Sequence, residues 1–133
     1  FTKFNAFVEN VAEGVHNLGS NQLVIALTNT APSAANSVLA DITQITYTNL
    51  SSRNVTTSSS SQTSGTYSLV CTDLVLTASG GSVGPFRYAV LYNDTPTSPA
   101  DPLIGYWDYG SSVTLASGET FTVDFGANVL TLV

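Results

Sequence analysis

The chain has 133 residues, of which 43% are hydrophobic and only 9% are charged. This length fits one domain around a single hydrophobic core, and the apolar content excludes a disordered chain. The net charge is -6 and the three cations, Lys3, Arg53 and Arg87, are scattered along the sequence, which argues against binding to nucleic acid or to an anionic membrane surface.

The first predicted element is an amphipathic helix within residues 1–19. Apolar residues recur at the spacing of one helix face: Phe4, Phe7, Val8, Val11, Val15 and Leu18. Gly19 follows them, and glycine is the residue that most often ends a helix. We therefore expect a helix over about residues 3–18. Its apolar stripe would pack on the domain or meet a partner through Phe4, Phe7 and Val11.

The chain from residue 20 to residue 65 starts with a strand and then becomes polar. LVIAL at 23–27 predicts a short, fully buried strand, which ends at the turn formers Asn29 and Pro32. Residues 38–48 are weakly patterned and predict a strand or an irregular edge. The Ser/Thr-rich stretch near 49–65 contains too few apolar residues to anchor a core. It predicts a mobile surface loop or an edge hairpin.

The second half predicts most of the strands. Candidate strands occupy residues 67–76, 86–92 and 103–109, residues 112–125 predict two strands around a turn at Ser117 and Gly118, and NVLTLV closes the chain. Short strands with frequent turn signals, and no alternation of strands with helices, indicate an antiparallel β-sandwich or jelly roll. The predicted fold is mainly β, a single domain over residues 1–133, in which residues 20–133 form the sandwich.

Arg87 lies in the middle of an apolar strand, where an unpaired charge would be costly. If residues 86–92 and 103–109 pair antiparallel with Tyr92 opposite Leu103, Arg87 lies opposite Asp108 and Tyr88 lies opposite Trp107. The same register puts Tyr88 and Trp107 together on an aromatic core face. We therefore expect Arg87 and Asp108 to form a structural ion pair. An anion-binding site is the alternative, but no second cation is near in the sequence to complete it.

Candidate catalytic and metal-binding patterns are weak. His16 is the only histidine, no G-x-S-x-G motif is present, and we expect His16 to be a solvated helix residue. Cys71 is the only cysteine, so no disulfide can form within the chain and no zinc site can be built on cysteines. Its apolar neighbours predict a buried, unreactive thiol. No catalytic residue, metal ligand or cofactor is expected.

Five segments carry a resemblance to a known family: FTKFNAFVENVAEGVHNLGSNQLVIALTNTAPS, SSSSQTSGTY, TASGGSVGPFRYAVLYNDT, PLIGYWDYGSSVTLASGETFTVDF and NVLTLV. Together they cover nearly the whole chain, which resembles a family of small structural proteins of tailed bacteriophages. The nearest counterparts in character are capsid decoration, or cement, proteins. These are β-sandwich or jelly-roll modules that form small oligomers on the outside of the head. The resemblance implies no catalytic residues.

The expected function is therefore that of a bacteriophage virion protein, a capsid decoration protein on the outer face of the capsid. Its expected partners are the major capsid protein and its own copies, in a dimer or trimer, with no nucleic acid and no membrane. One alternative is a tail or baseplate component. Another is a carbohydrate-binding module for host attachment, which would need an open aromatic face built from Tyr92, Tyr106, Trp107 and Tyr109.

Overall fold

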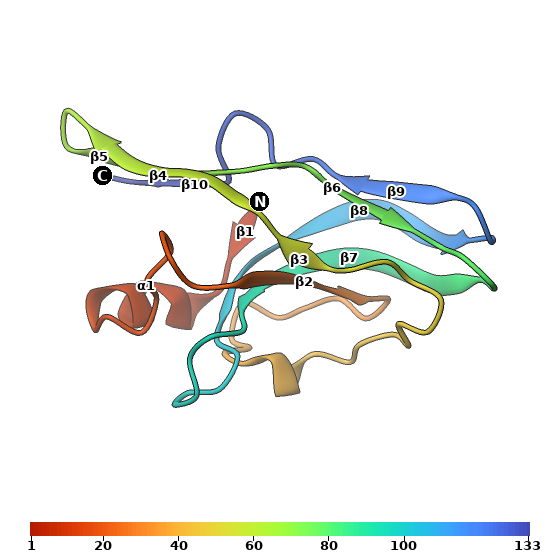
Figure 1. Ribbon diagram of the computed structural model, residues 1–133. Coiled ribbons are helices and arrows are strands. Elements are labelled where there is room, and N and C mark those ends of the chain that lie inside the picture. Colours follow the sequence, from red (N-terminus) through yellow and green to blue (C-terminus); the bar gives the residue numbers. More distant parts are fainter.

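The computed structural model describes residues 1–133 and is mainly antiparallel β-structure with one short helix (Figure 1). In chain order the elements are β1 (Thr2–Lys3), α1 (Asn5–Ala12), β2 (Leu23–Thr28), the 3-10 helix η1 (Leu39–Asp41), β3 (Asn54–Val55), β4 (Thr57–Thr63), β5 (Thr66–Cys71), β6 (Leu74–Thr77), β7 (Val83–Asn93), β8 (Leu103–Leu115), β9 (Thr120–Val123) and β10 (Leu130–Leu132). The predicted fold class, a mainly β antiparallel sandwich with an N-terminal helix, is confirmed.

The strands form two layers that pack face to face. One layer is a five-stranded sheet in the order β1-β8-β7-β2-β3, and the other contains a three-stranded sheet, β10-β5-β4, beside the two-stranded sheet β6-β9 (Figure 1). The chain crosses between the layers three times, at Thr56 between β3 and β4, between β6 and β7, and between β8 and β9. The two strands predicted within residues 112–125 are present as the end of β8 and as β9, but they do not pair with each other, because the turn at Ser117 and Gly118 joins two different sheets.

The main hydrophobic core lies between the two layers and contains 20 buried residues. Leu27, Leu91 and Ile104 contribute from the five-stranded sheet, and Leu69 and Leu76 contribute from the opposite layer. All five side chains are fully buried. Cys71 belongs to the same cluster, so the prediction of a buried thiol is confirmed. Burial raises the pKa of this thiol.

A second cluster of seven buried residues covers the other face of the five-stranded sheet. Its members are Phe4, Val24, Ala26, Ile42, Val90, Tyr92 and Leu103. The segment between β2 and β3 folds under the sheet as an irregular third layer that carries η1 (Figure 1). Tyr47 ties this segment to the sheet, since its hydroxyl accepts a hydrogen bond from the Leu27 N–H at 2.9 Å. All six residues of β2 are buried because both faces of this strand are covered.

The N-terminal helix is shorter than predicted. It ends at Ala12 and not near Leu18, because Gly14 adopts a left-handed backbone conformation with φ of 76° directly after the last turn. Residues 15–17 are irregular and a turn follows at 18–20, so Leu18 reaches the main core from a turn and not from a helix. Phe4, Phe7 and Leu18 of the predicted apolar stripe are buried, but Val8 is 54% exposed. Gly14, and not Gly19, ends the helix.

Two further strand predictions need correction. The Ser/Thr-rich stretch near 49–65 contains β3 and β4, and β4 pairs with β5 at the edge of its sheet, so of the two predictions for this stretch the edge hairpin is confirmed and the mobile loop is wrong. The single strand predicted at 67–76 is broken at Thr72 and Asp73, which allows β5 to join one small sheet and β6 the other. Residues 38–48 form an irregular edge, which was one of the two predictions for that segment.

Leu27→Ala and Leu103→Ala test the main core and the second cluster separately. Both leucines are 0% exposed, so each change should lower the free energy of unfolding by about 2–5 kcal/mol through loss of burial and creation of a cavity. Val75→Ala is the control at a position that is 52% exposed, and should change this free energy by less than about 0.5 kcal/mol. Urea denaturation measures all three. If Leu103→Ala behaves like Val75→Ala, the second cluster does not stabilise the fold.

Candidate functional site

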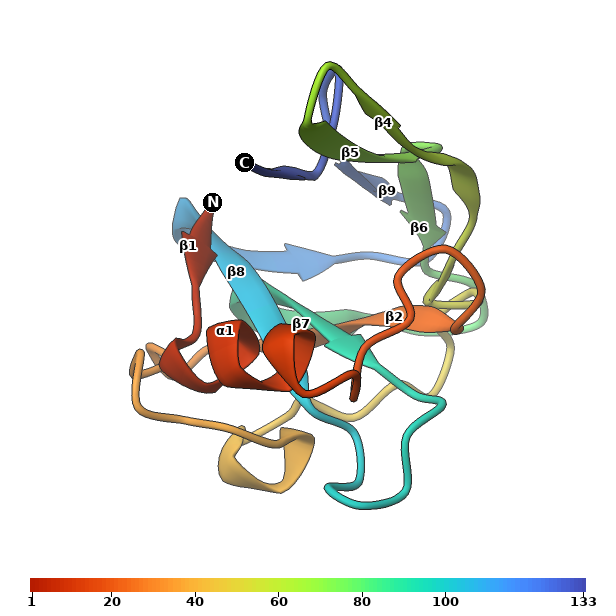
Figure 2. The ribbon, with the colours of Figure 1, turned by 90° about the vertical axis from the view of Figure 1, so that its left-hand side faces the viewer.

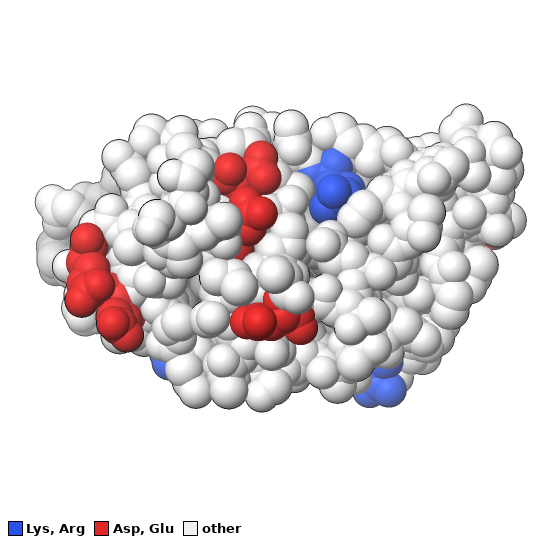
Figure 3. All heavy atoms as spheres, turned by 90° about the horizontal axis from the view of Figure 1, so that it is seen from below, with Lys and Arg blue, Asp and Glu red and all other residues white.

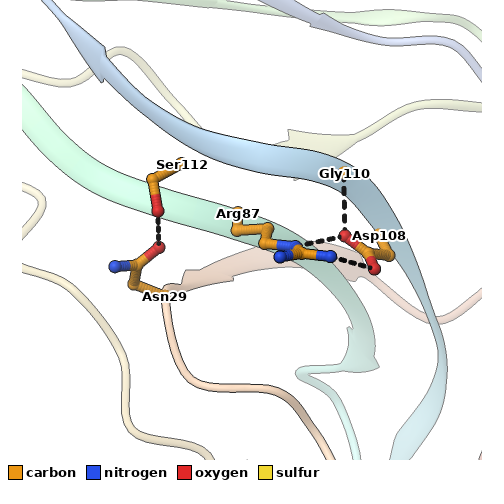
Figure 4. Close-up of polar contacts among 5 residues, drawn as sticks. All are labelled: Asn29, Arg87, Asp108, Gly110 and Ser112. Carbon is orange, nitrogen blue, oxygen red and sulfur yellow. Dashed lines mark hydrogen bonds and ion pairs between the residues drawn. The ribbon is translucent and has the colours of Figure 1, made fainter.

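Arg87 and Asp108 form an ion pair between neighbouring strands β7 and β8. The guanidinium donates two hydrogen bonds to the carboxylate, from Nε to Oδ1 at 2.8 Å and from Nη2 to Oδ2 at 3.0 Å (Figure 4). Oδ1 also accepts the backbone N–H of Gly110 at 2.8 Å. These bonds lower the pKa of Asp108 and raise the pKa of Arg87, so both groups are charged at neutral pH.

The register that led to this pair is only partly correct. Tyr92 does lie opposite Leu103, but a bulge between Leu91 and Tyr92 shifts every later pair by one residue. Tyr88 therefore lies opposite Asp108, and Arg87 meets Asp108 from a diagonal position. A shift of one residue exchanges the faces of a strand. The predicted shared face of Tyr88 and Trp107 is wrong: Trp107 packs against the main core, whereas Tyr88 contacts Tyr106 beside the second cluster.

A larger irregularity follows in β8, directly beside the ion pair. Asp108 pairs with Tyr88, but the next paired residue is Val113, opposite Phe86, so Tyr109 to Ser112 face only Arg87. Gly110 in this bulge has φ of 97°, a conformation that favours glycine. The hydroxyl of Ser112 donates to Oδ1 of Asn29 at 2.7 Å, which holds the bulge against the end of β2 (Figure 4).

The ion pair lines a small pocket between β7, β8 and β9, which we call the aromatic pocket. Its volume is about 170 Å³. Tyr109 is 57% exposed and packs against Phe121 with 5.1 Å between ring centroids, while Phe121 meets Phe86 edge to face. Ten residues line the pocket: Phe86, Arg87, Ala89, Trp107, Asp108, Tyr109, Phe121, Thr122, Val123 and Asp124.

The ion pair is at the surface, and not on an apolar face as expected. The side chains of Arg87 and Asp108 are 39% and 43% exposed. Exposed pairs contribute little to stability, because water already solvates both charges and ordering two side chains costs entropy. The Arg87–Asp108 pair therefore contributes little to the free energy of unfolding. Its position in the wall of the aromatic pocket is the feature to consider for function.

The predicted partner contacts on the N-terminal segment need correction. Phe4 is 0% exposed and Phe7 is 3% exposed, so neither side chain is available to a partner. Phe4 lies in the second cluster and Phe7 in the main core, because the segment packs against the sandwich and not outward. Val11 is half-buried. The apolar residue of α1 that faces solvent is Val8, which is 54% exposed.

Val8 and Val11 belong to an apolar groove between the two ends of the chain, which we call the terminal groove. Its volume is about 390 Å³. It runs between α1, β1 and β10, which lie at the same end of the molecule (Figure 2). Phe1 is 50% exposed at its edge and packs on Trp107 with 4.8 Å between ring centroids, so the groove adjoins the aromatic pocket. Eight residues line it: Phe1, Lys3, Phe7, Val8, Val11, Leu130, Thr131 and Leu132.

His16 is buried, so the expectation of a solvated helix residue is wrong. It is 8% exposed and packs against Phe7, and its Nδ1 lies 3.1 Å from Nδ2 of Asn93. The amide orientation of Asn93 is fixed, because its Oδ1 accepts the N–H of Thr95. Nδ2 of Asn93 therefore donates to His16, and the imidazole hydrogen is on Nε2, which has no partner. Burial lowers the pKa of His16 to about 4.

The lowered pKa of His16 predicts a loss of stability in mild acid. The unfolded chain binds a proton on His16 below its ordinary pKa of 6.5, whereas the folded chain does so only below about 4. The free energy of unfolding should therefore fall by about 2.5 kcal/mol between pH 7 and pH 4.5. Urea denaturation at both pH values measures the change. His16→Asn keeps a hydrogen-bond acceptor but cannot titrate, and an equally steep loss in this variant would contradict the assignment.

The structure meets neither the requirements of a metal site nor those of a membrane-spanning helix. No cluster of three or more His, Cys, Asp or Glu side chains has the arrangement of a metal site. None of the helices has the length and apolar character of a membrane span.

Comparison with known proteins identifies no relative of the chain. No protein-family model, no curated protein and no solved structure matches the chain.

Proposed function

We propose that the protein is a structural component of a tailed-bacteriophage virion and that it acts as a capsid decoration protein on the outer face of the head. Its partners in this proposal are the major capsid protein and further copies of itself, in a dimer or trimer. The proposal rests on the resemblance of five segments of the chain to small virion proteins and on the character of the surface.

The observation that carries the proposal is the terminal groove. Phe1 and Val8 are about half exposed at its rim, and Val133 beyond β10 is fully exposed. The edge strands β1 and β10 border the groove and leave backbone groups free to pair. Contiguous exposed apolar side chains beside a free strand edge are typical of a surface that binds protein.

The remaining surface fits a location outside the packaged DNA. The chain has a net charge of -6, and wide areas of the face in Figure 3 carry no charged side chain between scattered acidic groups. Such a surface is repelled by DNA but is easily buried against protein, because hydroxyl groups cost less to dehydrate than charges. The exposed serines of β4 belong to this surface.

The mechanism of the proposed function is mass action. A protein that binds only the expanded shell stabilises that state in proportion to the logarithm of its free concentration over its dissociation constant. A symmetric shell repeats the same contact many times, and an oligomer that bridges neighbouring capsomers gains avidity. Each single contact through the terminal groove can therefore be modest in area.

Val8→Asp tests the proposal on expanded heads of the phage that encodes the protein. The wild-type protein should co-sediment with heads that lack it and should raise their resistance to heat. Val8→Asp places a charge at the rim of the groove and should weaken binding at least about tenfold, because burying an unpaired carboxylate is costly. Val75→Asp is the matched control, since Val75 is 52% exposed on β6 and does not line the groove. This variant should bind like the wild type.

Two results would contradict the proposal. One is a wild-type protein that does not bind expanded heads at all. The other is labelling of virions with an antibody against the protein that marks the tail and not the head, which would favour a tail or baseplate component. Equal binding of Val8→Asp and wild type would keep the capsid assignment but remove the terminal groove as its contact.

A further inference from the structure

The aromatic pocket is lined by two kinds of groups, aromatic rings and charged side chains. One wall consists of aromatic rings, among which Tyr109 is 57% exposed and Trp107 is half-buried. The other wall carries the Arg87–Asp108 pair and Asp124. Ligand sites typically have this composition, a mostly apolar lining with a few polar groups that fix orientation.

The charges of the pocket select against an anion. The carboxylate of Asp108 already neutralises Arg87, and the carboxylate of Asp124 leaves a net charge of -1 among the lining residues. A phosphate or an acidic sugar would meet uncompensated negative charge. The polar groups can instead form hydrogen bonds with a neutral ligand, since Nη1 of Arg87 has no protein partner and Asp124 uses Oδ1 only for the Gly126 N–H.

The backbone of β8 orients Asp108 and Tyr109 through a bulge that interrupts its pairing with β7. The bulge from Tyr109 to Ser112 interrupts the β7–β8 ladder and leaves backbone groups unpaired. Bulges of this kind occur beside binding sites, where they re-aim side chains. Here the bulge follows Asp108, begins with Tyr109 and is fixed by two hydrogen bonds, Gly110 to Asp108 and Ser112 to Asn29 (Figure 4).

We propose that the aromatic pocket binds one ring of a neutral pyranose sugar. The C–H face of a pyranose packs on an aromatic ring, and its hydroxyls donate to carboxylates and accept from a guanidinium. A volume of about 170 Å³ is below the roughly 300–1,000 Å³ of sites for drug-sized molecules, and it limits the ligand to a single ring. This site adjoins the terminal groove at Phe1 and Trp107 but shares no lining residue with it, and the proposal does not depend on the proposed function.

Trp107 provides the measurement, because it is the only tryptophan of the chain and lines the pocket. The probes are the methyl glycosides of glucose, galactose, mannose and N-acetylglucosamine, titrated into the wild-type protein while tryptophan fluorescence is recorded. At least one glycoside should change the emission with saturation, at a dissociation constant on the order of millimolar for so small a ligand. Sorbitol at equal concentration controls for viscosity and solvent effects and should give no saturable change.

Variants of the pocket assign the signal to this site. Tyr109→Ala removes the exposed ring and should weaken binding about tenfold, whereas Tyr109→Phe keeps the ring and should bind within about twofold of the wild type. Arg87→Gln removes the guanidinium donors and should weaken binding by a similar factor. Val8→Asp lies in the terminal groove and should leave sugar binding unchanged, so the two surfaces can fail independently.

Three results would overturn the proposal. One is the absence of saturable change with every neutral glycoside. Another is tighter binding of N-acetylneuraminic acid than of any neutral glycoside, which would indicate an anion site. The third is equal binding by Tyr109→Ala and wild type while both unfold at the same urea concentration, which would place the sugar elsewhere.

Discussion

The five-stranded sheet is covered on both faces, and this constraint determines most of the structure. Its central strands β2 and β7 separate the main core from the second cluster, so their residues must be apolar without alternation. A strand of this kind cannot carry a charge at its middle without a large desolvation cost. Arg87 is tolerated in β7 because it lies toward the end of the covered region, where the sheet emerges into solvent and the side chain is 39% exposed.

Burial on both faces also explains why the pairing of β7 with β8 is irregular. Without alternation, the side chains of β7 do not specify which face is inward, and the register is set by the loop and by bulges. One bulge lies beside Leu91 and Tyr92. Next to it, β7 and β8 each contribute side chains to both clusters, Leu91 and Ile104 to the main core and Tyr92 and Leu103 to the second cluster. The other bulge, from Tyr109 to Ser112, interrupts the regular pairing of β7 and β8 at the point where the residues of β8 become exposed to solvent. The arrangement of Asp108 and Tyr109 in the wall of the aromatic pocket is a local consequence of this second irregularity.

The sequence indicated the fold class because turn residues and short apolar segments are local signals. It also indicated the ion pair, since a lone cation in an apolar strand requires a nearby carboxylate. It could not indicate the faces of Tyr88 and Trp107, because a bulge of one residue leaves no mark in the stretches 88–92 and 103–107, which contain no charged residue and do not alternate. The burial of His16 was missed for another reason: Asn93, which holds it, is distant in the sequence and is brought to it only by the fold.

The two sides of the sandwich are closed to different degrees, and the terminal groove and the aromatic pocket both lie on the more open side. On one side the chain passes directly from β3 to β4, and Thr72 donates its backbone N–H to the Thr56 carbonyl, so the edges of the two layers are joined. On the other side β1 pairs with only two residues of β8, and β10 is the free edge of its sheet. Free strand edges invite association and are usually blunted by bulges or charges. The bulge at Tyr109 and the charge of Asp108 blunt the far part of β8, whereas the part near β1 remains apolar. The edges are joined at the β3–β4 connection, whereas the open side carries a groove and a pocket that meet at Phe1 and Trp107, and both proposed contacts lie there.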